Sequence, residues 1–205
     1  MRLSLCSSGV WLGTFFIVAT VGCQRSPVSS ASIDTEIVEV RVDDATIAAG
    51  RPLAVIDPVW WTANIYDGPA AYEQSLQPFS KAQRLVHAML WYQEEVNNGG
   101  HEQFYSNSTG IVWQDALEGF EAAALPQVAA VLRESANRLG GSPSLVREDR
   151  QKQLASLSPH FDDLDDKFYE LEKRVDVEGK IMEFIRSRLK DFYFSGRVEK
   201  PVRAR

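Results

Sequence analysis

Cysteine is almost missing from this chain of 205 residues, since it occurs only at Cys6 and Cys23. Residues 24–205 therefore hold no disulfide, no cysteine nucleophile and no zinc site built on thiolates. Any domain in this region must be stabilised by buried apolar side chains. A hydrophobic content of 44% in a chain of this length is enough for one such core.

An excess of basic residues is also missing. The chain has 22 Lys and Arg against 28 Asp and Glu, a formal net charge of −6. Proteins that coat nucleic acids depend on clustered basic residues, so we expect no direct nucleic-acid binding. The sequence lacks the Gly-x-Ser-x-Gly elbow, the phosphate-binding loop and the dinucleotide fingerprint. We therefore expect neither an enzyme nor a bound cofactor.

The apolar run Val10–Val21 is too short for a membrane span but suits the core of a signal peptide. It ends at Thr20-Val21-Gly22-Cys23, which resembles a bacterial lipobox. We expect residues 1–22 to be a lipoprotein signal peptide and Cys23 to carry the lipid. The protein is then a membrane-anchored lipoprotein of the bacterial cell envelope that faces outside the cytoplasm. A soluble secreted protein is the alternative.

Residues 23–66 are expected to form a tether followed by an aromatic N-terminal arm. Val38, Val40 and Val42 alternate with polar residues, as in a strand. A lone strand cannot satisfy its edges, so we expect an extended or weakly ordered arm. The aromatic residues of the arm are expected to pack onto the following domain, with a membrane or partner contact as the alternative; they are Trp60, Trp61 and Tyr66.

From residue 67 to residue 195 the apolar residues recur at helical spacing, and prolines and glycines separate the segments. The pattern predicts an all-α fold, a compact bundle of roughly six or seven short helices. In the segment Ser144–Leu157 we expect Arg147, Arg150 and Lys152 to face water. Residues 196–205 are interpreted as a basic tail.

The stretch Glu94–Gly110 is the densest polar segment between two apolar ones. Glycine and asparagine tolerate left-handed backbone angles, so we expect Asn97, Asn98, Gly99 and Gly100 to stop a helix. Phe104 returns the chain to the core. The next helix is expected to begin with caps from Asn107 and Ser108, and Gly110 permits the reversal.

The same stretch allows a different interpretation. Glu94, Glu95, His101 and Glu102 supply three carboxylates and an imidazole, the groups of a hydrolase or metalloprotein site. A metal site needs ligands that converge, and no second histidine lies near His101 in the sequence. We favour the structural interpretation, in which no metal is bound.

Four aspartates lie close together at Asp162, Asp163, Asp165 and Asp166. A calcium loop would need a glycine and ligands at alternate positions, which this run lacks. Acidic residues at this density are typical of a helix start. If the domain has an acidic binding face, these four with Glu94 and Glu95 are the candidates.

The block from Glu95 to Gly110 resembles the signature of a bacterial all-helical family named for a DNA-mimic protein. The matching positions are Asn97, Asn98, Gly99, Gly100, Gln103, Phe104, Asn107, Ser108 and Gly110. His101 stands where the family pattern favours an aromatic residue such as Phe. The resemblance extends over about residues 69–194, and Leu164–Tyr169 also fits it.

This resemblance implies an all-α fold without a cofactor. It also implies binding to a DNA-binding protein through carboxylates placed like phosphates. From the whole sequence we expect a non-catalytic protein-interaction domain on a lipid-anchored protein. No residue names its protein partner.

Overall fold

A computed structural model describes residues 34–202. The expected signal peptide, Cys23 and most of the tether lie outside the described residues. The elements in chain order are β1 (Thr35–Val42), α1 (Asp44–Ala48), α2 (Pro52–Val55), α3 (Asp57–Thr62), α4 (Pro69–Leu76), α5 (Lys81–Ser106), the 3₁₀-helix η1 (Ser108–Val112), α6 (Trp113–Ala122), α7 (Pro126–Arg138), α8 (Arg147–Leu157), α9 (Asp162–Arg174), α10 (Val177–Arg186), α11 (Leu189–Phe192) and β2 (Phe194–Pro201).

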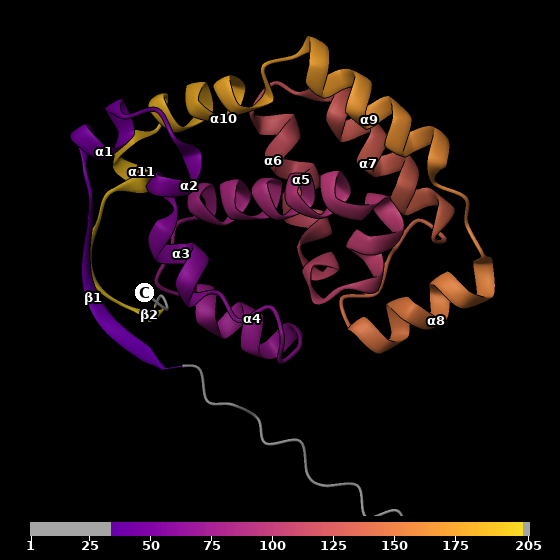
Figure 1. The fold of residues 1–205 in the computed structure, drawn as a ribbon, viewed down its shortest axis with the longest axis horizontal. Helices are drawn as coiled ribbons and strands as arrows, with labels where there is room; N and C mark the ends of the chain where they lie inside the picture. Colours follow the sequence, from indigo (N-terminus) through magenta and orange to yellow (C-terminus); the bar gives the residue numbers. More distant parts are fainter. Residues whose placement is uncertain (1–33, 203–205) are drawn as a thin grey trace, which may run out of the picture. The chain divides into compact units, whose positions relative to one another are not determined.

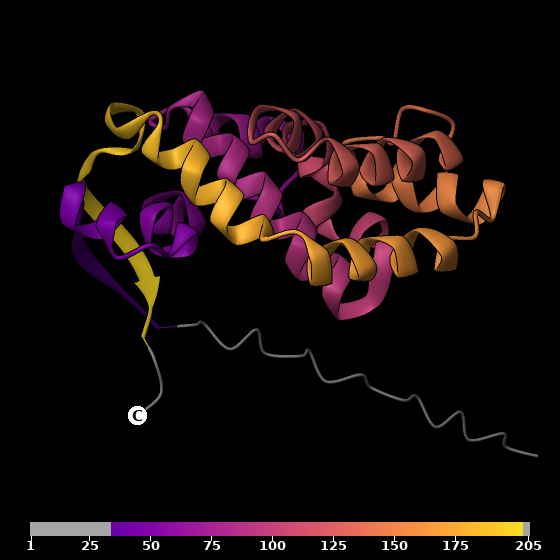
Figure 2. The ribbon, with the colours of Figure 1, turned by 90° about the horizontal axis from the view of Figure 1, so that it is seen from above.

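Helix α5 is the centre of the fold, and α2, α3, α6, α8, α9 and α11 all contact it (Figure 1). Its midpoint residue Tyr92 is fully buried. The Tyr92 ring packs edge-on against Phe104, Phe120 and Phe168 at centroid distances of 5.2–5.4 Å. Edge-to-face aromatic contacts of this kind add to the stability that burial provides. Seen from above, α9 and α10 follow each other across α5 (Figure 2).

The described part of the chain is mostly helical, as predicted, with eleven α-helices, of which eight (α4–α11) lie in residues 67–195, where six or seven were predicted. Pro69 occupies the first turn of α4, a position that suits its fixed φ and missing amide hydrogen. The last apolar segment of the bundle forms two helices, α10 and α11, because the chain leaves the helical conformation at Arg188. None of the described helices combines the length and the apolar character needed to cross a lipid bilayer.

Residues 35–42 are extended, as one of the two expectations for the arm has it, but they are not weakly ordered, and residues 196–201 of the expected tail belong to a strand. The two segments pair as the antiparallel strands β1 and β2, with Val38 opposite Val198. Val198 is buried, and Val40 packs against the core. The tail therefore supplies the partner that a lone β1 strand lacks.

Residues 44–62 also differ from the predicted arm, because they form α1, α2 and α3. Asp43 begins α1 by accepting hydrogen bonds from the Ala45 and Thr46 amides. Trp60 of α3 stacks on Trp91 of α5 with ring centroids 4.3 Å apart. The prediction that aromatic residues pack onto the domain is confirmed for Trp60. Trp61 and Tyr66 stay exposed.

Candidate functional site

The candidate site is the polar stretch within α5. This helix begins with a capping box, in which the Gln83 amide donates to Ser80 Oγ and the Ser80 amide donates to Gln83 Oε1. Its regular path is interrupted at Gly99 and Gly100, where the backbone is non-helical. The predicted interruption is confirmed, although the helix resumes at once and continues to Ser106.

Gly100 is required by the backbone and by its surroundings. Its φ of 73° lies in the left-handed region that favours glycine. A Cβ atom at this position would lie 2.3 Å from Oδ2 of Asp165 on α9. No larger residue fits there unless the Asp165 carboxylate moves away.

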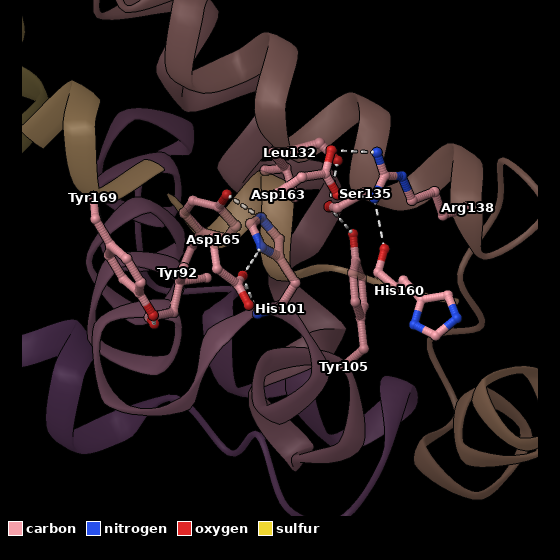
Figure 3. A network of polar contacts seen from close by, with 11 residues as sticks. Tyr92, His101, Tyr105, Leu132, Ser135, Arg138, His160, Asp163, Asp165 and Tyr169 are labelled. Carbon is pink, nitrogen blue, oxygen red and sulfur yellow. Dashed lines mark hydrogen bonds and ion pairs between the residues drawn. The ribbon is translucent and has the colours of Figure 1, made fainter. Parts of the chain in front are cut away.

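Asp165 caps the resumed part of α5 (Figure 3). Its Oδ1 accepts a 2.9 Å hydrogen bond from the His101 amide and also contacts His101 Nδ1. The opposite ring nitrogen, Nε2, lies 2.7 Å from the buried hydroxyl of Tyr92. Burial raises the pKa of the Tyr92 hydroxyl well above its usual value, so it stays protonated. His101 therefore links α9 to the centre of α5.

Asp165 was expected at a helix start or on an acidic binding face, and only the first fits. It lies in the first turn of α9, but its carboxylate is directed at α5 (Figure 3). The position of His101 is also fully buried, between the rings of Tyr92 and Phe161. A planar side chain suits this position.

Glu95 forms the second link within the stretch. Its side chain is buried, with 8% of the residue exposed. The carboxylate accepts hydrogen bonds from Gln103 Nε2 (2.8 Å), Asn107 Nδ2 (2.9 Å) and Thr109 Oγ1 (2.8 Å). These contacts join the part of α5 before the interruption to the part after it and to η1. Assigning Glu95 to an exposed acidic face is therefore wrong.

The predicted capping role of Asn107 and Ser108 is also wrong. Neither side chain caps η1, and the Asn107 amide group donates to Glu95 instead. The Asn107 side chain thus acts as a hydrogen-bond donor within the joint, meaning the set of contacts through which Glu95 and His101 connect the two parts of α5 to each other and to α9. The sequence instead predicts an acceptor at a helix start. Phe104 is fully buried, as predicted.

Arg150 of α8 closes the end of α5. The sequence pattern had suggested that it faces water, but it is fully buried. Its guanidinium donates to the carbonyl oxygens of Tyr105 (2.7 Å), Ser144 (2.6 Å) and Asn107 (2.6 Å). Burial lowers the pKa of Arg150 to about 10, which still leaves it charged at neutral pH. A cation beside the carbonyl end of a helix also complements the helix dipole.

Gly110 is explained by the same arginine. Its φ is not positive, so the predicted conformational role does not apply. A Cβ atom at Gly110 would lie 2.5 Å from Arg150 Nε and 2.7 Å from the carbonyl oxygen of Phe104. Close packing of a buried guanidinium, rather than a chain reversal, requires glycine here.

With this geometry described, comparison with known proteins identifies a family. The DMP19-like protein family matches residues 77–188. The chain belongs to this family. The match agrees with the resemblance to a family named for a DNA-mimic protein. Searches of the curated proteins and of the solved structures give no match.

The matched region of this DMP19-like protein runs from the residues before α5 to the end of α10, so it includes every link described above. Both strands, α1–α4 and α11 lie outside the match.

The alternative catalytic site does not assemble in the DMP19-like domain. Glu94 and Glu102 are exposed, whereas His101 and Glu95 are buried and hydrogen-bonded to different partners. Within residues 34–202 no three His, Cys, Asp or Glu residues are placed to hold a metal ion. The four groups proposed from the sequence therefore do not converge.

The predicted acidic face is reduced to half of its members. Asp163 forms a two-point ion pair with Arg138, at 2.5 and 2.9 Å, and this pairing lowers the pKa of Asp163 to about 2 (Figure 3). Asp165 and Glu95 bond internally. Glu94, Asp162 and Asp166 remain exposed, without an ion pair inside the described region.

One buried histidine was not singled out by the sequence. His87 accepts a 2.9 Å hydrogen bond from Trp91 Nε1 and lies between Trp60 and Tyr72. Burial lowers its pKa to about 3, so the ring is neutral at physiological pH. Its spacing of four residues from Trp91 on one helix is the signal that predicts their contact.

Proposed function

We propose that this protein is a non-catalytic protein-interaction domain, carried outside the cytoplasm on a lipid anchor. The observation that supports it is the division of the signature into two sets of side chains. The reactive inward set, His101 and Glu95, is fully used in holding α5 to its neighbours. The outward set, Glu94, Asn97 and Glu102, is left at the surface.

Membership in a family named for a DNA-mimic protein supports binding to a protein rather than to a nucleic acid. A mimic of DNA needs several unpaired carboxylates in a row. In this chain the run on α9 is interrupted, because Asp163 is paired with Arg138 and Asp165 is bonded to His101. We therefore propose a protein partner that recognises apolar and polar groups together with a few carboxylates, and not a continuous strip of negative charge.

The second part of the proposal is the location of the protein in the cell, and it is supported by the sequence alone. A lipid on Cys23, followed by the Ser-rich tether, would hold the domain at the envelope membrane. The substitution Cys23→Ser tests this membrane location. The variant should leave the membrane fraction, and unchanged fractionation would show that Cys23 is not the anchor.

Partner binding is tested by capture of the tagged full-length chain after mild chemical cross-linking and membrane extraction. We expect a protein that co-purifies in an amount comparable with the bait. The matched measurements are metal content and hydrolysis of general ester and peptide substrates by the same preparation. A chain that purifies alone with one equivalent of metal, or that turns over a substrate, would contradict the proposed function.

A further inference from the structure

We propose that a groove between α2, α3, α5 and α10 binds a protein segment in which an apolar side chain is flanked by lysine or arginine. This inference rests on the proposed function and assigns it a surface. The groove has a volume of about 380 Å³. Its lining residues are Pro52, Leu53, Trp60, Leu90, Gln93, Glu94, Asn97 and Glu178.

The apolar part of the groove is accessible and firmly built. Leu53 is 50% exposed, although it belongs to a helix that packs on α5. Trp60 is held in place by its parallel stack on Trp91, with an angle of 11° between the rings. An exposed leucine beside an immobilised tryptophan is a surface that an apolar side chain of a partner can cover.

The charge at the groove has one sign. Glu94 and Glu178 line it and are exposed, and neither forms an ion pair with another described residue. A third carboxylate, Glu172, accepts a 3.0 Å hydrogen bond from the lining residue Gln93. No lysine or arginine is among the lining residues. Electrostatic complementarity therefore favours a partner segment with positive charges on either side of its apolar anchor.

Asn97 adds a polar contact at the same place. It is exposed, and its side chain makes no hydrogen bond to any residue between 34 and 202. An amide carries both donors and an acceptor, so it can bond to the main chain of an extended segment. Asn97 and Glu94 are thus two of the outward side chains of the signature stretch that the packing of α5 leaves unused.

The groove is not a feature of the family region alone. Pro52, Leu53 and Trp60 precede residues 77–188, and the other lining residues lie within them. The N-terminal helices of this chain therefore add one wall to a surface of the family domain. A second hollow, between α7 and α9, is lined by Asp166, Glu170, Lys167 and Arg174. Its mixed charges give no such preference for a partner of one sign.

The inference is tested by panning a random peptide library displayed on phage against the immobilised full-length chain. We expect the enriched peptides to carry Lys or Arg beside Leu, Phe or Trp. Their affinity should fall about tenfold or more for Glu94→Lys/Glu178→Lys, because two close charge pairs are lost. Leu53→Ser should weaken the same peptides while the salt dependence of binding remains.

The matched control is Glu102→Lys/Glu148→Lys, which also reverses one exposed glutamate of α5 and one in the first turn of another helix. It should bind the peptides like the wild type, and circular dichroism verifies the fold of each variant. Enrichment of acidic peptides, equal binding by both double variants, or failure to enrich any peptide would overturn the inference. A partner captured equally well by both double variants would contradict the groove but leave the proposed function intact.

Discussion

Gly100 shows at the scale of a residue why a polar stretch can be structural. Its left-handed backbone and its contact with the Asp165 carboxylate each exclude a side chain. Gly99 differs, since its φ of −166° is open to any residue. A Cβ atom there would meet the end of the flexible Gln103 side chain. The two adjacent glycines therefore have different costs of replacement.

We predict that Gly100→Ala lowers the free energy of unfolding by about 2–4 kcal/mol, the sum of a left-handed backbone penalty and a disturbed buried hydrogen bond. Gly99→Ala serves as the control and should cost less, about 1 kcal/mol, because its backbone is unstrained and only the hydrogen bond from Gln103 to Glu95 is disturbed. Urea unfolding of both variants measures the difference. Equal losses would mean that Asp165 does not restrict Gly100.

His87 gives a pH prediction at the same scale. Its folded-state pKa is about 3 because of burial, against about 6.5 in an unfolded chain. Between these values the unfolded chain binds a proton that the folded chain does not bind. The free energy of unfolding should therefore fall as the pH drops from about 6.5 to about 3, by up to about 1.4 kcal/mol per pH unit.

Replacement of the imidazole isolates this contribution. His87→Gln should unfold with a shallower dependence on pH than the wild type over the same window, as measured by urea unfolding at a series of pH values. His160→Gln, which removes an exposed histidine, is the control variant. A slope for His87→Gln that equals the wild-type slope would show that His87 is protonated in the folded protein.

At the scale of an element, α5 depends on neighbours at its interruption and at its end. At the interruption, Asp165 from α9 accepts a hydrogen bond from the His101 amide. Just before it, Tyr169 from α9 donates a 2.9 Å hydrogen bond to the Val96 carbonyl oxygen. At the C-terminal end of α5, Arg150 and Arg147 from α8 donate hydrogen bonds to the carbonyl oxygens of residues 105–107. The central helix is thus completed by side chains of α8 and α9.

We predict that Arg150→Lys lowers the free energy of unfolding by about 2–4 kcal/mol, because one ammonium group cannot reach both the carbonyl oxygens at the end of α5 and that of Ser144. Arg147→Lys is the control. Arg147 is exposed and donates to Ser106 alone, so this change should cost less than about 1 kcal/mol. Hydrogen exchange should show faster exchange near residues 105–110 for Arg150→Lys only. Similar losses for both variants would contradict the role of Arg150.

The limits of sequence-based prediction are also visible in the elements. Helices such as α4, α6 and α7 follow from local apolar spacing and from Pro69 and Pro126, so their positions were predictable. The pairing of β1 with β2 was not, because Ser195, Gly196 and Arg197 have no strand pattern and lie far along the chain from β1. Nor does a polar helix without apolar periodicity indicate that Arg150 is buried.

The same limits apply to the candidate site. Its position and its helix-interrupting glycines were predictable from residue types, because glycine and asparagine have known backbone preferences. The hydrogen-bond partners of Glu95 and Asp165 were not predictable, since the residue type alone does not show whether a carboxylate faces water or a buried amide. Ser80 and Gln83 did carry a readable signal, the three-residue spacing of a capping box.

At the scale of the whole molecule, the elements outside the matched residues matter as much as the family region. Residues 35–62 and 194–201 are packed onto or paired beside the matched region, and they change which surfaces are available to a partner. Trp60 and Leu53 form a wall that the matched residues alone do not supply. The matched region therefore contains the polar links within α5, while the proposed binding surface also needs residues outside the match.

The most direct test of the account is the amount of partner captured per folded molecule of His101→Phe. The account assigns His101 to the joint between α5 and α9, so this variant should unfold at lower denaturant concentration yet capture as much partner as the wild type. Phe keeps the planar ring and removes both ring hydrogen bonds. A folded His101→Phe variant that loses the partner, a bound metal or a measurable turnover would contradict the account.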